Sequence, residues 1–415
     1  MRIVSTMALA LAIGGMAVAT PVLAKEKKEA AAKYTPAVQN ALAAAQTALK
    51  ANDVATATAK VNEAKAAAQN DEDRYATGSI EYQISRQNND QAMQSDAIDL
   101  MIASNKAPPE QMAQLLLVQG QVAYQAKNWS KAITSLTAAQ KAGSTEPNLV
   151  PVLVTSMANN GQTAQALTTL NSLIDQTLAA GKPVPQEWYQ QGISIGYKTQ
   201  ASSPDAAAVY AATGDLTKKW VAAYPTKSNW HDAMTIYMSQ NKVPTDIMVD
   251  VFRLERAAGA LGGDAEYREY AEDVYLRIPN EAKVVLEEGV SKGIVNATNK
   301  DAAEVLGLVK GKVAADQASL AQSDKAARTA ANGKTALSTA DGYVSYSQYD
   351  KAIDLYKLAL TKGGVDAPTV NLHLGWALAL KGDAAGAKAA FAQVTGARKA
   401  LADFWVVHLD HPTQG

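Results

Sequence analysis

Apolar residues along this chain recur at intervals of three and four residues rather than at every second position. One run places Leu115, Val118 and Val122 on a single helical face, and residues 133–139 continue the same spacing. This spacing matches the period of an α-helix, whereas a half-buried strand would alternate apolar and polar residues. Alternating runs of Val, Ile and Thr are missing from the sequence. The pattern therefore predicts an all-α protein.

Short polar clusters interrupt the helical spacing. They contain Gly, Pro, Asn or Asp and read "KAPPE", "GSTEPN", "ANNGQ", "GKPVP", "LGGD" and "KGD". Residues of these types mark turns, because they supply positive φ angles, fixed φ angles or local side-chain hydrogen bonds. The chain is thus expected to be a series of helices joined by short turns.

A pattern of small and bulky residues returns at a nearly constant period. Its small residues are Ala132, Ala166, Ala352 and Ala387, and the step from the first to the second nearly equals the step from the third to the fourth. Each is followed four residues later by a bulky residue: Leu136, Leu170, Tyr356 or Phe391. Twelve residues before them stand Gly120, Val154, Ala340 and Gly375. Weaker copies centre on Ala57 and Ala97.

This period has a physical reason. Two antiparallel helices approach closely only where their facing positions are small, and a bulky residue one turn later fills the groove against the next pair. One helix pair cannot bury its own apolar face, so repeated pairs stack into a solenoid. The repetition therefore predicts one helix-pair unit used several times.

The pattern resembles the tetratricopeptide repeat (TPR) family. The nearest matches are "HLGWALALKGDAAGAKAAF" and "VQGQVAYQAKNWSKAITSL", and four units match over residues 110–180 and 335–400. The resemblance implies a TPR-like right-handed superhelix, an α-solenoid of antiparallel helix pairs. It also implies that the protein works by binding another protein.

We divide the chain into five segments. They are a signal peptide (1–24), an N-terminal helical region with degenerate TPR-like repeats (25–105), TPR repeats (106–184), a divergent helical middle region (185–335) and C-terminal TPR repeats (336–415). In the middle, "YPTKSNWHDAMTIY" is similar to a block in periplasmic TPR proteins, some of which accompany TonB-dependent energy transduction. A long helix is expected within residues 311–335, and a hinge, if there is one, near residue 185 or within 295–335.

The segment 1–24 has the features of an export signal. Arg2 precedes an apolar stretch, Met7 to Val18, that is too short to cross a bilayer comfortably, and Val22 and Ala24 form a small-residue cleavage site. An uncleaved membrane anchor is the alternative. Because the chain has no Cys, a lipoprotein anchor, disulfides and thiolate metal sites are excluded. The expected location is periplasmic or secreted, in a Gram-negative bacterium.

The charge balance also limits the choice of partners. Without Arg2, 38 of the 39 basic residues remain against 40 acidic residues, a net charge of −2. A balanced chain has no electrostatic footprint for nucleic acid. No later apolar stretch is long enough for stable membrane insertion. The partner is therefore expected to be another protein.

Candidate chemistry is sparse. His408 and His411 could supply at most two metal ligands, and we expect them in a solvated tail. "GISIG", centred on Ser194, lies in helical spacing rather than at a strand-to-helix turn, and "GALGGD" lacks the end of a P-loop. We therefore expect no enzyme, no cofactor and no metal. A cell-wall enzyme remains a minor alternative, with Glu187, Asp246 or Glu255 as the acid.

The resemblance implies that the first helix of each repeat lines the concave face, where TPR proteins hold peptides or partner helices. Seven residues on these helices are predicted to bind the partner: Gln121, Tyr124, Gln125, Thr155, Asn159, Leu372 and Trp376. Trp376 is a natural interface anchor, although it could instead pack as core against an adjacent repeat. The Lys/Asn clamp that some TPR domains use for carboxylates is not matched.

These features favour a non-enzymatic protein-binding scaffold of the bacterial cell envelope. The alternative is an accessory or assembly factor of an outer-membrane transport or secretion complex. The sequence predicts neither the identity of the partner nor the oligomeric state.

Overall fold

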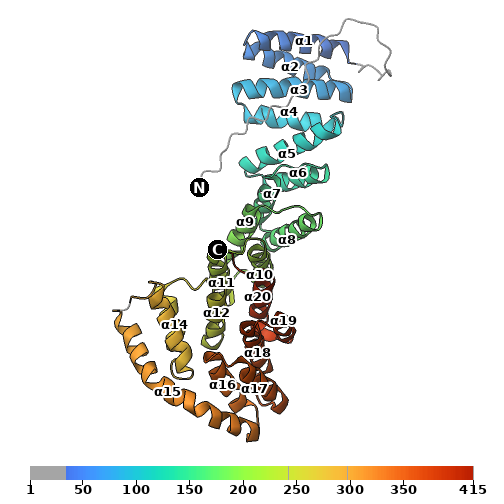
Figure 1. The fold of residues 1–415 in the computed structure, drawn as a ribbon. Coiled ribbons are helices and arrows are strands. Elements are labelled where there is room, and N and C mark those ends of the chain that lie inside the picture. The colour runs from blue at the N-terminus through green and yellow to red at the C-terminus, as the bar shows by residue number, and fades with distance from the viewer. Residues whose placement is uncertain (1–33, 242, 297, 415) are drawn as a thin grey trace. The chain divides into compact units, whose positions relative to one another are not determined.

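The structure is a computed structural model that describes residues 34–241, 243–296 and 298–414. Over these residues it contains 20 α-helices, one short 3-10 helix and no strand (Figure 1). The predicted fold class, an all-α TPR-like solenoid of antiparallel helix pairs, is confirmed. The predicted signal peptide lies outside the described residues.

The described residues form two compact units, which divide after residue 162: unit 1 begins at residue 34 and unit 2 begins at residue 163. The helices of unit 1 are α1 (Pro36–Lys50), α2 (Val54–Ala67), α3 (Asp71–Asn88), α4 (Gln91–Ala103), α5 (Pro109–Gln125), α6 (Trp129–Lys141) and α7 (Leu149–Asn159). Successive helices pack as the pairs α1–α2, α3–α4 and α5–α6. The division after residue 162 falls inside the predicted segment 106–184. The predicted segments were defined by repeat similarity rather than by compactness, so they stay predictions.

Side-chain caps begin several helices of unit 1. The carboxylates of Asp53 and Asp90 accept hydrogen bonds from the backbone N–H groups of Thr56 and Met93, and Asn128 caps α6 in the same way. Each cap satisfies a donor that has no partner inside the helix and contributes about 1 kcal/mol. The polar clusters that interrupt the apolar spacing therefore also fix where these helices start.

The repeated small residues lie where the helices of a pair touch. Ala132, Ala166, Ala352 and Ala387 are all fully buried. A Cβ atom on Gly120 would lie 2.5 Å from Cγ of Leu136, and one on Gly375 would lie 2.4 Å from Cε1 of Phe391. Neither gap accepts a methyl group without a shift. In the pairs α5–α6 and α18–α19, the twelve- and four-residue offsets in the sequence thus correspond to direct contacts between paired helices.

Unit 2 contains thirteen α-helices and the 3-10 helix. They are α8 (Thr163–Ala179), α9 (Gln186–Tyr197), α10 (Ala206–Ala223), α11 (Lys227–Asn241), α12 (Thr245–Ala257), α13 (Asp264–Val274), α14 (Pro279–Ser291), α15 (Lys300–Thr329), α16 (Lys334–Ser345), α17 (Tyr349–Lys362), α18 (Ala367–Lys381), α19 (Ala384–Phe391), η1 (Gly396–Arg398) and α20 (Lys399–Asp410). The divergent middle region is therefore helical. Its predicted long helix is α15, which begins earlier than expected and ends at Thr329.

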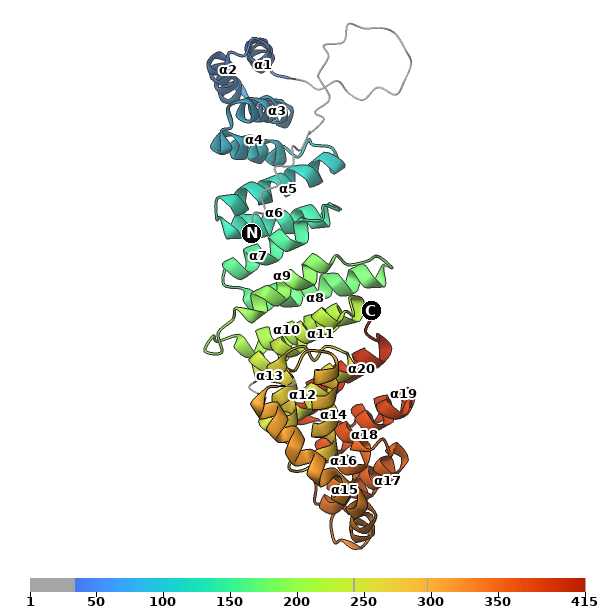
Figure 2. The same ribbon diagram turned by 60° about the vertical axis from the view of Figure 1, so that its left-hand side comes forward.

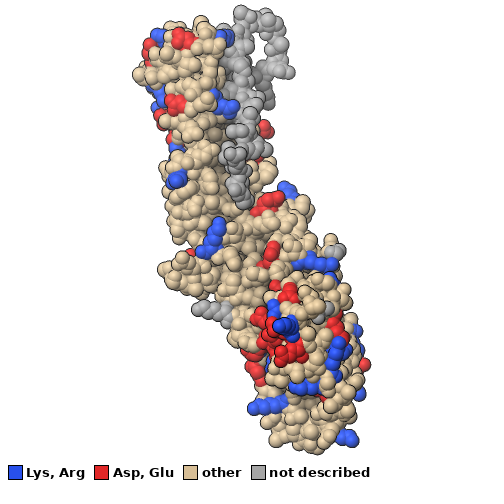
Figure 3. Space-filling model, turned by 90° about the vertical axis from the view of Figure 1, so that its left-hand side faces the viewer, with Lys and Arg blue, Asp and Glu red and all other residues tan. Residues whose placement is uncertain are grey.

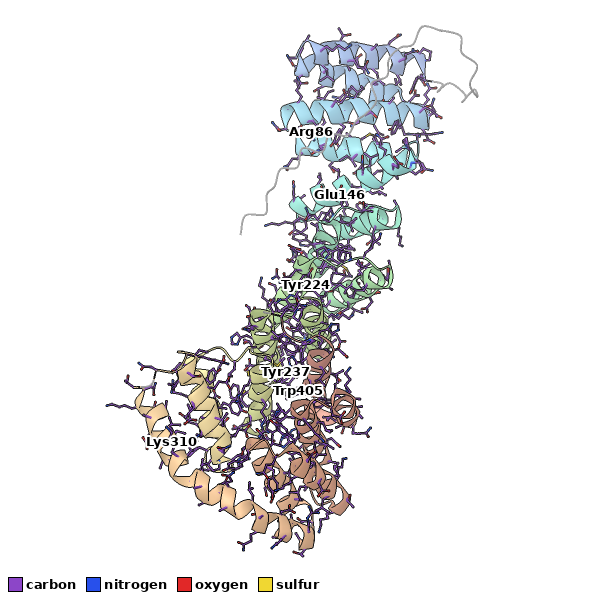
Figure 4. All side chains as sticks on the ribbon, in the orientation of Figure 1. Arg86, Glu146, Tyr224, Tyr237, Lys310 and Trp405 are labelled. Atoms are coloured by element: carbon purple, nitrogen blue, oxygen red, sulfur yellow. The ribbon has the colours of Figure 1, made fainter. Side chains whose placement is uncertain are left out.

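The last helix returns to the start of unit 2. Helix α20 packs against α10 and α12, next to α18 and α19 (Figure 2). The Phe404 ring meets those of Trp230 and Tyr237 edge-on at centroid distances of 6.2 and 6.1 Å. Figure 4 labels Tyr237 of α11 and Trp405 of α20 in this region. Helices from opposite ends of the unit 2 sequence thus share one core.

This return corrects one expectation about the C-terminus. His408 is not part of a solvated tail, because its ring packs edge-on against Trp230 and Trp405 at centroid distances of 5.5 and 6.0 Å. Burial lowers the pKa of His408. His411, one residue beyond α20, is exposed as expected. No helix in the described part of the chain is both long and apolar enough to span a bilayer.

Candidate functional site

A layer of buried charged side chains crosses the interior of unit 2. We call it the Arg253 bridge and define it as Asp250 and Arg253 of α12, Glu281 of α14, Asp341 of α16 and His373 of α18. Asp250, Arg253 and Glu281 are each at least 95% buried. Buried charges persist only when paired and hydrogen-bonded, so the geometry of each pair matters.

Arg253 is hydrogen-bonded to two carboxylates of the bridge. Glu281 accepts two parallel hydrogen bonds from its guanidinium group, from Nε and Nη2, both at 2.9 Å. Asp250 accepts a third, from Nη1, also at 2.9 Å. The Tyr270 hydroxyl donates to Glu281 at 2.6 Å. This bidentate geometry fixes the plane of the guanidinium group.

His373 likewise lies between two carboxylates of the bridge. Its Nδ1 lies 2.8 Å from Oδ1 of Asp341, and its Nε2 lies 3.0 Å from Oδ1 of Asp250. The Tyr356 hydroxyl donates to Asp341 at 2.6 Å. A neutral imidazole carries one proton, whereas both ring nitrogens here face carboxylates. The geometry therefore favours the doubly protonated ring, although Nη1 of Arg253 also lies 3.3 Å from Nε2.

The pKa directions agree with this assignment. Burial lowers the pKa of His373, but the charges of Asp341 and Asp250 outweigh it and raise the pKa to about 9. Burial raises the pKa of Asp250, but His373, Arg253 and Arg398 together lower it to about 2. At neutral pH His373 is therefore protonated and Asp250 is ionised.

Two of the predicted partner-binding residues lie at this bridge. The guanidinium carbon of Arg253 lies 4.1 Å from the centre of the Trp376 ring, a cation–π contact. Trp376 is 7% exposed and Leu372 is 1% exposed. Trp376 is therefore a buried residue, as the alternative interpretation expected. However, its cation–π partner is Arg253 of α12 rather than a residue of an adjacent repeat. A role of either residue in partner binding stays a prediction.

The other five predicted residues lie on neighbouring helices of unit 1. Gln121, Tyr124 and Gln125 are on α5, and Thr155 and Asn159 are on α7. We call this surface the α5–α7 face. Gln125 and Asn159 are exposed, and the other three are half-buried. The Tyr124 ring meets Trp129 edge-on at 5.5 Å, and the Thr155 hydroxyl donates to the Pro151 carbonyl.

The α5–α7 face is uncharged. Helix α7 contains no charged residue, and the only charge on α5 is Glu110 near its start. In contrast, acidic and basic side chains gather side by side in the lower part of the view in Figure 3. The predicted residues are thus of two kinds, an accessible neutral set in unit 1 and a covered set in unit 2.

The three candidate acids do not form a shared site. Glu187 is exposed on α9, and Asp246 pairs with Arg398 at 2.6 Å near the start of α12. Glu255, nine positions further along α12, is fully buried, and neither of its carboxylate oxygens has a hydrogen-bond partner among the described residues. Burial raises the pKa of Glu255 to about 9, and the nearby charge of Glu266 adds to this effect. A protonated Glu255 without access to solvent is poorly placed for catalysis.

Other side chains that could carry chemistry can also be located. Nδ1 of His231 lies 3.7 Å from carboxylate oxygens of Glu255 and of Glu266. Ser194 lies within helix α9, which agrees with the absence of a strand-to-helix turn there. In the described residues no group of three His, Asp or Glu side chains is placed to hold a metal ion.

Sequence reasoning missed the Arg253 bridge. Its residues come from positions 250 to 373, and no period in the sequence connects them. The available signal was charge within apolar surroundings, since Arg253 and Glu255 interrupt the run "MVDVFRLERA". Such a signal indicates burial of a charge without indicating its partner.

No protein-family model matches the chain, and no curated protein matches it. A solved structure described as "Structure of Naa15/Naa10 bound to HypK-THB" is 14% identical with a TM-score of 0.28. The similarity covers 88% of this chain and 58% of that one. Another, "Crystal structure of APC/C hetero-tetramer Cut9-Hcn1", is 12% identical with a TM-score of 0.21, covering 90% of this chain and 96% of that one. This chain thus spans 58% of the length of the first. The fold assignment rests on the helix pairs themselves.

Proposed function

We propose that this protein is a non-enzymatic scaffold that binds another protein on the α5–α7 face of unit 1. The observation that carries the proposal is the character of this face. Two neighbouring first helices present Gln, Asn and Thr side chains around Tyr124, with no charged side chain among the five residues. Such amide and hydroxyl groups suit the backbone of a bound segment, and an amphipathic tyrosine suits an anchor.

The predicted partner-binding residues differ in exposure between the two units, and this difference supports the choice of the α5–α7 face. In unit 2 the corresponding side chains, Leu372 and Trp376, are buried, and the guanidinium group of Arg253 packs on the face of the Trp376 ring. In unit 1 the corresponding groups remain accessible. A partner segment that docks without prior opening of the protein therefore has its surface in unit 1.

Site-specific photocrosslinking in cells tests the proposal. A photoreactive residue at Gln125, on the proposed face, is compared with one at Thr134, which is exposed on α6. We expect one dominant adduct at Gln125, little at Thr134, and loss of the Gln125 adduct when Tyr124→Ala and Asn159→Ala are combined. Equal labelling at both positions, or no adduct at Gln125, would contradict the proposed face.

We further propose that the protein works in the bacterial cell envelope. The support is the sequence of the segment 1–24, and the partner is then an envelope protein. Fractionation with N-terminal sequencing tests this location: a mature chain beginning at Lys25 in the periplasmic fraction is expected. A cytoplasmic chain that retains Met1 would overturn the location while leaving the α5–α7 face to be judged by crosslinking.

A further inference from the structure

A cavity of about 420 Å³ lies on one side of the Arg253 bridge, between α12 and α16. The bridge residues Asp250, Asp341 and His373 form its charged floor. Five aliphatic side chains line its walls, Val249, Val274, Ile278, Leu337 and Val365, and Asp246, Ser338 and Asp366 line it as well. Small-molecule sites commonly have this composition, an apolar wall with a few converging polar groups, and volumes of about 300–1,000 Å³.

Two exposed cations line this cavity, Arg277 after α13 and Lys334 at the start of α16. Within the described residues, neither has an acidic partner at ion-pair distance. Arg253 and Arg398 differ from them: the first is paired with Glu281 and Asp250, and the second with Asp246. The two other acidic residues that line the cavity, Asp246 and Asp366, both lie within ion-pair distance of Arg398. Arg277 and Lys334 are thus the cations that remain for a ligand carboxylate.

The floor of the cavity carries carboxylates rather than unpaired cations. Oδ2 of Asp250 is buried and has no hydrogen-bond partner in the described residues, since Nε of Arg398 is 3.5 Å away. Asp341 uses Oδ1 for both His373 and Tyr356 and keeps 15% of its side chain exposed. The exposed part of the Asp341 carboxylate can therefore accept hydrogen bonds from a ligand, and the negative charge of the covered Asp250 favours a cationic group there.

We propose that this cavity binds a small zwitterion, a free amino acid with an aliphatic side chain. Its carboxylate pairs with Arg277 and Lys334, its ammonium group faces Asp250 and Asp341, and its side chain lies against the aliphatic walls. This site is in unit 2 and is independent of the protein partner proposed for the α5–α7 face.

Isothermal titration calorimetry with the full-length mature chain and L-leucine tests the site. The wild-type chain is expected to bind one equivalent, and Arg277→Gln/Lys334→Gln is expected to weaken binding at least tenfold. The matched control is Lys300→Gln/Lys312→Gln, which removes the same charge from exposed positions on α15 that do not line the cavity. All four positions are exposed, so neither double variant should perturb folding, and circular dichroism checks this.

Two analogues test the assignment of the charged ends. L-leucine methyl ester lacks the carboxylate and N-acetyl-L-leucine lacks the ammonium group, so each should bind at least tenfold more weakly than L-leucine. The proposal is overturned by no L-leucine binding to the wild-type chain, by equal loss in both double variants, or by N-acetyl-L-leucine binding as well as L-leucine. The last result would show that the floor of the cavity does not bind the ammonium group of the ligand.

Discussion

Units 1 and 2 use the same joint between paired helices but treat their inner faces differently. Gly120 and Leu136 meet in α5 and α6 as Gly375 and Phe391 meet in α18 and α19. In unit 1 the predicted partner-binding positions on α5 and α7 then carry neutral side chains. In unit 2 a buried ionic layer ties α12 to α16 and α18. The comparison shows that repeated residues determine stacking, whereas non-repeated residues determine what each face can do.

The largest effect should come from removing the cation of the bridge. Arg253→Met leaves Glu281 and Asp250 buried without their main partner, and losing one member of a buried ion pair costs about 3–5 kcal/mol. The free energy of unfolding of unit 2 should fall by this amount. Five of the six Trp lie in unit 2, so Trp fluorescence during urea unfolding mainly follows this unit.

A second variant distinguishes the cost of an unpaired buried charge from the cost of lost packing. Arg253→Met/Glu281→Leu removes two of the buried charges together, and it should recover part of the loss because apolar pairs of similar volume often replace buried ion pairs without cost. Unit 1, followed by hydrogen exchange of α1 to α6, should be unaffected in both variants. A loss shared by both units would contradict the picture of a bridge confined to unit 2.

The bridge should also make unit 2 sensitive to alkali. Because the folded-state pKa of His373, about 9, lies above its unfolded value near 6.5, its contribution is complete below pH 6.5 and is lost as the pH rises through 9. Between pH 7 and 10 this removes about 2–3 kcal/mol. Urea unfolding across this range measures the loss, and His373→Gln should reduce it. Unchanged curvature in His373→Gln would show that the imidazole is not the group responsible.

Glu255 should also make unit 2 less stable as the pH rises, but here the neutral substitution should stabilise the protein. Its carboxyl group stays protonated in the folded protein up to a pKa of about 9, whereas the unfolded chain releases the proton near pH 4.5. Stability is therefore lost as the pH rises above 4.5, and Glu255→Gln should raise the free energy of unfolding by roughly 3 kcal/mol at pH 7 and by little at pH 4.

Glu81 of unit 1 is the matched control for Glu255. It is also buried, but Nζ of Lys65 lies 2.5 Å from its Oε1. Burial raises the pKa of Glu81 as well, whereas the contact with Lys65 opposes this rise. Glu81→Gln should therefore stabilise unit 1 less than Glu255→Gln stabilises unit 2, which hydrogen exchange can measure. An equal gain at neutral pH from both substitutions would mean that burial alone, rather than the presence of a charged partner, sets the size of the effect.

The smallest effect concerns the shared joint. Gly120→Ala and Gly375→Ala each add a methyl group 2.4–2.5 Å from a neighbouring side chain, and overpacking of this kind costs about 1–3 kcal/mol. Gly214, which has open space where a Cβ would lie, provides the control, and Gly214→Ala should be neutral or slightly stabilising. If the two joint variants differ widely from each other, the two units do not share one packing rule.

The sequence predicted what is local and periodic. The helical spacing, the small residues at Ala132 and Ala387, and the close approach at Gly120 and Gly375 all follow from short offsets along the chain. It did not predict that α20 returns to α10, nor that Arg253 of α12 covers Trp376 of α18. These contacts depend on how many helix pairs separate the partners and on their accumulated rotation. No single repeat contains that information.

The return of α20 also affects the order in which the chain can acquire its structure. Each helix pair of unit 1 is built from residues close in sequence, so it can form as soon as its two helices are present. The core around Trp230 and Phe404 joins positions far apart in the sequence and requires the end of the chain. Contacts over such separations form slowly because the intervening loop must first be closed. Unit 1 should therefore fold first during synthesis, and the aromatic surface of α10 and α11 stays exposed until the last helix arrives.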